Sequence, residues 1–171
     1  VDPDNRSPVD YSIRAKMLEE LKKLESETEP EKLSFELTRN KEDGRIKLYL
    51  TYKALNFRKA NRELFHNSEY IPLQATGNNS AHILAFARAK GTATALTIVP
   101  RLLTGCLKSY ELPLGDIWKD TYLLLPEEMA GSAYRNIFTG QTITPIEHEG
   151  KNVITLSDVF SSFPVALLEN S

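Results

Sequence analysis

The chain has 171 residues, of which 41% are hydrophobic and 26% charged, with a formal net charge of −2. This composition is typical of a folded globular protein, and the small charge excludes an electrostatic case for binding nucleic acid or an anionic membrane. No spanning apolar run or targeting segment is visible, and a single cysteine, Cys106, excludes an intrachain disulfide and favours a reducing cytoplasm.

The first ten residues, VDPDNRSPVD, predict a tight loop. Pro3 and Pro8 are incompatible with a helix interior or a central strand, and Asp and Asn side chains bond their own backbone in turns. We interpret so specific a loop at the start of the sequence as an internal segment of a longer chain. We therefore expect the chain to be one part of a larger enzyme.

Residues 1–68 read as a helical part. Asp10 is suited to cap a helix whose apolar residues recur at spacings of three and four, namely Ile13, Met17, Leu21 and Leu24. The polar stretch Glu25–Lys32 is interrupted by Pro30 and predicts a surface connection.

A second helix is predicted from about Gly44 to Ala60. Its apolar residues, among them Tyr49 and Tyr52, occupy more than one face, so the helix should be covered on more than one side. We expect the rest of this chain on one side and a neighbouring domain on the other. Without that neighbour, the exposed helix faces would favour self-association.

After Phe65 the pattern changes to short apolar or alternating runs separated by turn residues. The predicted strands are Glu69–Ala75, His82–Arg88, Thr92–Val99, Thr121–Leu125, Tyr134–Phe138, Gln141–Pro145, Val153–Leu156 and Pro164–Leu168. No helical stretch long enough for a parallel crossover lies between them, so we predict an antiparallel β-sandwich over residues 69–171. The expected fold class is mainly β with an N-terminal helical part.

The chain shows no convincing catalytic or metal site. Its histidines, His66, His82 and His148, are far apart in sequence and none has a ligand spacing for zinc. Carboxylates are plentiful but cluster at the predicted turns, and no Gly-rich phosphate loop or serine nucleophile motif is present. We therefore expect no metal, no cofactor and no catalytic residue.

Several residues are candidates for binding. Arg6, held in a loop bracketed by prolines, suits recognition of carboxylates or sugar hydroxyls, although it could instead pair with the neighbouring Asp side chains. Arg45 and Lys47, at the start of the second helix, suit either an interface or a solvated helix start. Trp118 and Tyr110 would form a sugar-stacking platform if exposed, whereas a lone Trp in a sandwich is more often part of the core.

The order of motifs along the chain resembles the malto-oligosyltrehalose synthases of the α-amylase superfamily. The opening loop is similar to the loop VDPDNRRPVD of that family, with Ser7 in place of the usual second Arg. The segment Asp43–Leu50 and the following helix resemble the last barrel helix and the start of the C-terminal domain. Other similar segments lie at 100–102, 112–115, 118–121, 136–140 and 163–168.

The resemblance implies an isomerase that converts the reducing-end α-1,4 linkage of a maltodextrin into an α,α-1,1 linkage by intramolecular transglucosylation. The nucleophilic Asp and the acid/base Glu of such enzymes lie on earlier barrel strands, which these 171 residues do not contain. The chain would then begin in the loop after barrel strand eight, where Asp2, Asp4, Asn5 and Arg6 could help to shape the substrate pocket. Maltodextrin would be bound through the missing barrel.

Three hypotheses follow. The first is an inactive, structural C-terminal part of such a synthase. The second is a maltodextrin-binding module that uses Trp118 or Tyr110, or an accessory C-terminal domain of another α-amylase-superfamily enzyme. The third is an interaction domain without a carbohydrate role.

Overall fold

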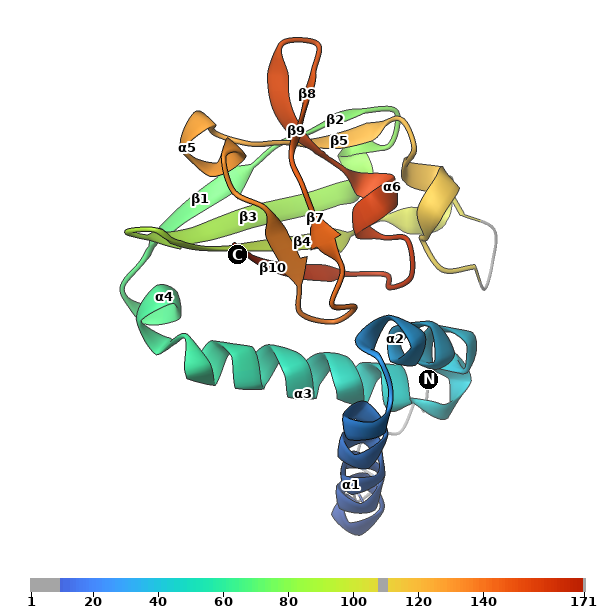
Figure 1. Cartoon of the computed structure of the whole chain (residues 1–171). Helices are drawn as coiled ribbons and strands as arrows, with labels where there is room; N and C mark the ends of the chain where they lie inside the picture. The colour runs from blue at the N-terminus through green and yellow to red at the C-terminus, as the bar shows by residue number, and fades with distance from the viewer. Residues whose placement is uncertain (1–9, 108–110, 171) are drawn as a thin grey trace.

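The computed structural model describes residues 10–107 and 111–170. Helices form the first part of the chain and antiparallel strands the second (Figure 1). Together the helices hold more residues than the strands, so the fold is mixed α and β, whereas the sequence pattern predicted a mainly β chain. Within the described ranges, no helix combines the length and apolar character needed to cross a membrane.

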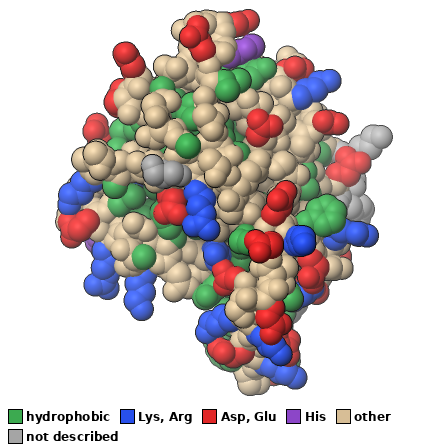
Figure 2. Space-filling model, viewed as in Figure 1, with side chains coloured by type: hydrophobic (Ala, Val, Ile, Leu, Met, Phe, Trp, Pro, Cys, Tyr) green, Lys and Arg blue, Asp and Glu red, His purple; other side chains and the backbone are tan. Residues whose placement is uncertain are grey.

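Helix α1 spans Tyr11–Glu27 and begins as predicted. The Asp10 carboxylate accepts hydrogen bonds from the backbone N–H of Ser12 at 2.9 Å and of Ile13 at 3.2 Å, which satisfies two of the free donors of the first turn. The apolar stripe is buried only toward its end: Leu21 is 1% exposed, whereas Ile13 is 57% exposed. The first half of α1 therefore projects from the molecule, where charged side chains crowd its surface (Figures 1 and 2).

Helix α2, Pro30–Arg39, was not predicted. Pro30 is the first residue of this helix. The N–H groups of the first turn have no partner within the helix, so the missing N–H of proline removes no helical hydrogen bond. Leu33 and Leu37, one turn apart, are both fully buried. The prediction of a surface connection over Glu25–Lys32 is therefore wrong at both ends, because α1 continues to Glu27 and α2 begins at Pro30, and only Thr28 and Glu29 connect them.

Helix α3, Arg45–Ala60, agrees with the predicted second helix. It follows a short 3-10 helix, η1 (Lys41–Asp43), and Gly44, whose φ of 80° lies in the left-handed region that glycine adopts easily. The short helix α4, Arg62–His66, comes next. Helix α3 packs against α1 and α2 and also runs along the six-stranded sheet (Figure 1). The other helices therefore cover one side of α3, and the sheet covers another.

The strands form two antiparallel sheets. The six-stranded sheet has the order β1-β3-β4-β10-β6-β7, and the four-stranded sheet has the order β2-β5-β9-β8. The strand bounds are β1 Glu69–Leu73, β2 Ala75–Gly77, β3 Ile83–Lys90, β4 Ala93–Pro100, β5 Thr121–Leu124, β6 Tyr134–Asn136, β7 Thr142–Ile143, β8 Ile146–His148, β9 Lys151–Thr155 and β10 Ala166–Asn170. The short helical segments between them are η2 Ser80–His82, η3 Leu103–Gly105, η4 Gly115–Trp118, α5 Glu127–Ala130 and α6 Leu156–Val159.

Two apolar clusters hold these layers. The first joins the facing residues of both sheets, for example Ile98 and Leu168 of the larger sheet with Leu123 and Ile154 of the smaller one. The second lies on the other side of the six-stranded sheet, between that sheet and the helices. Its buried members are Leu21, Leu33, Leu37, Tyr49, Leu64, Ala95, Phe138, Phe163 and Leu167. The helical part and the sheets therefore share an apolar interior.

Candidate functional site

The predicted site residues fall into two groups. Asp2, Asp4, Asn5, Arg6 and Tyr110 lie outside the described residues. Arg45, Lys47 and Trp118 lie within them, and the structure does not bring the three together in one site. Arg45 and Lys47 are on the first turn of α3, whereas Trp118 ends η4.

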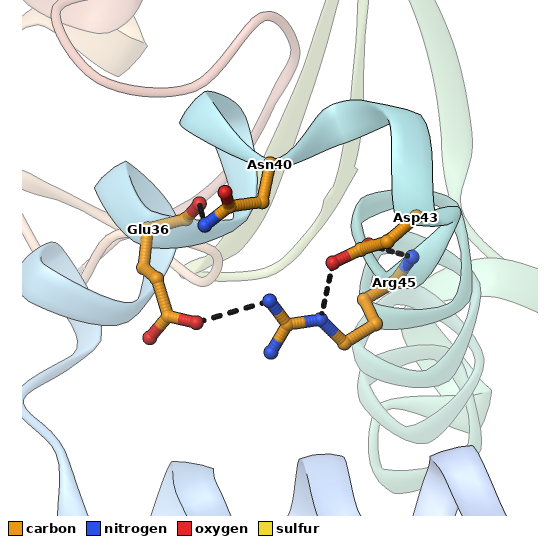
Figure 3. Close-up of polar contacts among 4 residues, drawn as sticks. All are labelled: Glu36, Asn40, Asp43 and Arg45. Carbon is orange, nitrogen blue, oxygen red and sulfur yellow. Dashed lines mark hydrogen bonds and ion pairs between the residues drawn. The ribbon is translucent and has the colours of Figure 1, made fainter.

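Arg45 forms the polar cluster drawn in Figure 3. Its Nε donates to Oδ2 of Asp43 at 2.7 Å, and its Nη2 donates to Oε1 of Glu36 at 3.0 Å. The backbone N–H of Arg45 also donates to Oδ1 of Asp43 at 2.8 Å, so Asp43 caps the start of α3 although it lies two residues earlier. The guanidinium at the start of α3 thus binds one carboxylate of α2, that of Glu36, and one of η1, that of Asp43.

Asn40 completes this connection from the other side. Its backbone N–H and its side-chain Nδ2 both donate to the carbonyl oxygen of Glu36, at 3.1 and 3.0 Å. These bonds satisfy a carbonyl at the end of α2 that would otherwise have no partner in the helix. The turn between α2 and α3 is therefore held at both ends by local hydrogen bonds.

The charges in the cluster stabilise one another. Desolvation raises the pKa of the Asp43 carboxyl, but the hydrogen bonds from the Arg45 backbone and guanidinium outweigh it, so that the pKa lies below its usual value. The same pairing acts on Arg45 in the opposite direction: the hydrogen bond to Asp43 raises the pKa of Arg45, and the hydrogen bond to Glu36 raises it further. Asp43 and Arg45 therefore remain ionised near neutral pH.

This geometry is better suited to fixing the α2–α3 turn than to binding an anion. Two carboxylates neutralise the single positive charge of Arg45, so the cluster presents no uncompensated positive charge. Lys47 is exposed, and its ammonium group makes no hydrogen bond or ion pair with another described residue. A role of Arg45 and Lys47 in binding substrate stays a prediction.

Trp118 cannot serve as an exposed platform for sugar stacking. Its side chain is fully buried in the cluster between the sheets, and its Nε1–H donates to the carbonyl oxygen of Pro113 at 2.8 Å. The ring packs at 5.5 Å from the ring of Phe160. The indole therefore offers no free face to a ligand, and the core interpretation of this lone Trp replaces the binding one.

The histidines lie in separate surroundings. His148 stacks on Tyr122 with ring centroids 4.2 Å apart, whereas Nδ1 of His82 is buried without a hydrogen-bond partner. Across residues 10–107 and 111–170, no three His, Cys, Asp or Glu side chains are grouped so that they could hold a metal ion.

The sequence patterns did not identify a groove beside α3. A cavity of about 470 Å³ lies between α3, α4 and the six-stranded sheet. Its walls come from segments far apart in the sequence, so no local motif could indicate it. The one available signal was that α3 is apolar on more than one face, which predicted two partners for this helix.

Comparisons with known proteins give one informative likeness. No protein-family model matches the sequence, and no curated protein sequence matches it. A solved structure of a mutant of maltooligosyltrehalose synthase from Arthrobacter ramosus is similar in fold, with a TM-score of 0.65 and 28% sequence identity. The match covers 100% of this chain and 18% of that chain, so this chain spans less than a fifth of the length of the structure it resembles.

Proposed function

We propose that this chain is the C-terminal part of a maltooligosyltrehalose synthase and that its role there is structural. In this proposal, residues 1–68 belong to the end of a catalytic barrel, and residues 69–171 form the antiparallel β-sandwich that follows it. The complete enzyme would convert the reducing-end α-1,4 linkage of a maltodextrin to an α,α-1,1 linkage. The part of the barrel outside this chain would bind the sugar and supply the catalytic carboxylates, and the opening loop of this chain would help to shape the substrate pocket.

The observation that carries the proposal is the structural likeness over the whole chain. Helices and sheets together match one solved synthase with a TM-score of 0.65 and 28% identity. A likeness confined to the sheets would fit many accessory domains. Because the helical part is included, the match supports a segment that crosses from one domain into the next.

The packing of the helical part supports a structural role. Phe163 follows α6 and packs against Phe138 with ring centroids 5.3 Å apart and against Tyr49 of α3 at 6.0 Å. All three side chains are buried. These contacts would fix α3, the last barrel helix in this proposal, against the sheets.

Maltopentaose conversion by the purified chain tests the proposal. We expect the folded chain to leave the concentration of reducing ends unchanged and to bind the sugar without saturation in the millimolar range. Formation of an α,α-1,1-linked product by the chain alone, detected by NMR, would overturn the structural role. Saturable binding without conversion would instead favour a maltodextrin-binding module.

A further inference from the structure

The groove beside α3 is apolar on both walls. Leu50, Ala54 and Leu55 line it from α3, and Phe86 of β3 and Val99 of β4 line it from the sheet. The volume of about 470 Å³ is enough to receive several apolar side chains. The groove lies on the outer face of the six-stranded sheet, opposite to the face that packs on the smaller sheet.

The apolar surface continues beyond the groove toward strand β1. Tyr70 is 51% exposed and its ring stacks on Phe86 with centroids 4.9 Å apart. Leu84, directly opposite Val99 in the sheet, is 43% exposed, and Leu55 on the helix side of the groove is 59% exposed. Three strongly exposed large apolar side chains therefore border one groove, which is a feature of interaction surfaces.

The charge around the groove has one sign. Arg58 of α3 and Arg88 of β3 line it, and no Asp or Glu is among its described lining residues. The guanidinium of Arg58 makes no hydrogen bond or ion pair with another described residue, and the guanidinium of Arg88 lies 5.2 Å from the ring centroid of Tyr70 without an acidic partner among the described residues. Both guanidiniums can therefore pair with acidic groups on a ligand.

The layer of helices on this sheet face is incomplete. Helices α3 and α4 cover part of the face, whereas the side chain of Tyr70, on the edge strand β1, is left open to solvent. Neighbouring helices pack about 8–10 Å apart, so a second helix beside α3 would lie over β3 and β4, whose residues line the groove, and would fill it. Its apolar residues would contact Leu55 and Phe86.

We propose that this groove binds an amphipathic α-helix of a protein partner whose flanking positions are acidic. The apolar stripe of that helix packs between α3 and the sheet, and its Glu or Asp side chains pair with Arg58 and Arg88. This helix-in-groove mode places hydrophobic anchors in the groove and charges at its rim. The inference rests only on the geometry of the groove and does not depend on the proposed function.

Two synthetic helical peptides of about 16 residues test the proposal. Both carry Leu at positions i, i+4, i+7 and i+11, and the flanking positions are Glu in one and Lys in the other. Isothermal titration calorimetry of the full chain should show that the Glu peptide binds about tenfold more tightly, as expected for two partly screened ion pairs. The double variant R58E/R88E should reverse this preference.

The control variant R14E/K23E changes the net charge by the same amount on helix α1, away from the groove, and should keep the wild-type preference. Leu55→Ser should weaken binding of the Glu peptide at least about tenfold while the far-UV circular dichroism stays that of the wild type. Equal affinity for both peptides, or no binding of the Glu peptide, would contradict the proposal. Self-association that Leu55→Ser abolishes would assign the groove to a second copy and would also overturn it.

Discussion

The hydroxyl group of Tyr49 donates a hydrogen bond of 2.7 Å to the carbonyl oxygen of Phe138, and both residues are buried. Tyr49 lies on α3 and Phe138 follows strand β6, so this bond joins the helical part to the six-stranded sheet across 89 residues of sequence. Burial also raises the pKa of the Tyr49 hydroxyl strongly, which keeps it protonated as a donor. The bond is therefore a direct link between the two parts of the chain.

The variant Tyr49→Phe should lower the free energy of unfolding by about 1–3 kcal/mol, because a buried carbonyl oxygen loses its donor. Urea unfolding followed by far-UV and near-UV circular dichroism measures this change. The two signals should shift together, because the helices and the six-stranded sheet share one buried apolar cluster.

The variant Tyr70→Phe is the matched control for Tyr49→Phe. Tyr70 is exposed, and its hydroxyl makes no hydrogen bond with another described residue. Its unfolding free energy should stay within about 0.5 kcal/mol of the wild type. Equal effects of the two substitutions would show that the link to Phe138 contributes nothing.

Arg45→Gln should destabilise the chain by up to about 1 kcal/mol, because the side chain of Arg45 is partly exposed and solvent screens the pairs. The effect should depend on pH. The pKa of Asp43 is lower in the folded state than in the unfolded state, so its contribution is present above the unfolded pKa and is lost as the pH falls through the folded pKa.

Urea unfolding at pH 7 and pH 3 should therefore show a larger difference between wild type and Arg45→Gln at pH 7. As a comparison, Lys22→Gln removes the exposed pair with Glu19 and should have a smaller effect at both pH values. A difference for Arg45→Gln that is the same at pH 3 would show that the carboxylates are not its partners.

The fold was predictable from sequence where the pattern is local. Asp10 and the apolar spacing after it predicted α1, and the prediction of a helix from about Gly44 to Ala60 agrees with α3. Helix α2 was missed because Pro30 was interpreted as an interruption, although the first turn of a helix accepts proline. Leu33 and Leu37, four residues apart, were the signal that could have corrected this.

The strands show the same limit. Each of the eight predicted strands overlaps an observed one, but the first prediction, Glu69–Ala75, combines β1 with the start of β2, which belongs to the other sheet. Strand β8, Ile146–His148, is only three residues long and pairs in a hairpin with β9, too short for an alternating pattern to appear. Sheet membership depends on contacts between distant segments, which periodicity does not report.

The candidate site was less predictable than the fold. Arg45 was selected because it begins a helix, but its carboxylate partners come from different elements, and Glu36 lies on the helix that was missed. Trp118 could be interpreted either as exposed or as core until its burial was known. In both cases the deciding quantity was a tertiary contact.

Gly77→Ala should be strongly destabilising. Gly77 has a φ of +96°, and a Cβ atom there would lie 1.8 Å from the carbonyl oxygen of Asp120, which is backbone and cannot move aside easily. We expect a loss of more than about 3 kcal/mol, from strain and from disruption of the pairing of β2 with β5. Thermal unfolding of the variant measures it.

Gly91→Ala is the control for Gly77→Ala. Gly91 also has a positive φ, of +60°, but an added Cβ would meet no atom within 4 Å. Its cost should be limited to the backbone strain of about 1–2 kcal/mol. A variant Gly77→Ala that is no less stable than Gly91→Ala would contradict the close approach to Asp120.

The emission of Trp118 should be blue-shifted relative to free tryptophan, because the indole is fully buried. Maltopentaose at millimolar concentration should leave the spectrum unchanged, since a sugar cannot reach the ring. Trp118 is the only tryptophan of the chain, so the signal reports on it alone. A saturable change in emission would restore the binding-module hypothesis.

The structural role is tested most directly by a chimera in which this chain replaces the matching 18% of the Arthrobacter ramosus synthase. Loss of reducing ends from maltopentaose measures its activity. We predict a folded chimera that keeps the conversion within about tenfold of the parent enzyme, because the proposal places the catalytic carboxylates outside the exchanged part. A chimera that is folded and still binds maltopentaose but no longer converts it would contradict the structural role of this chain.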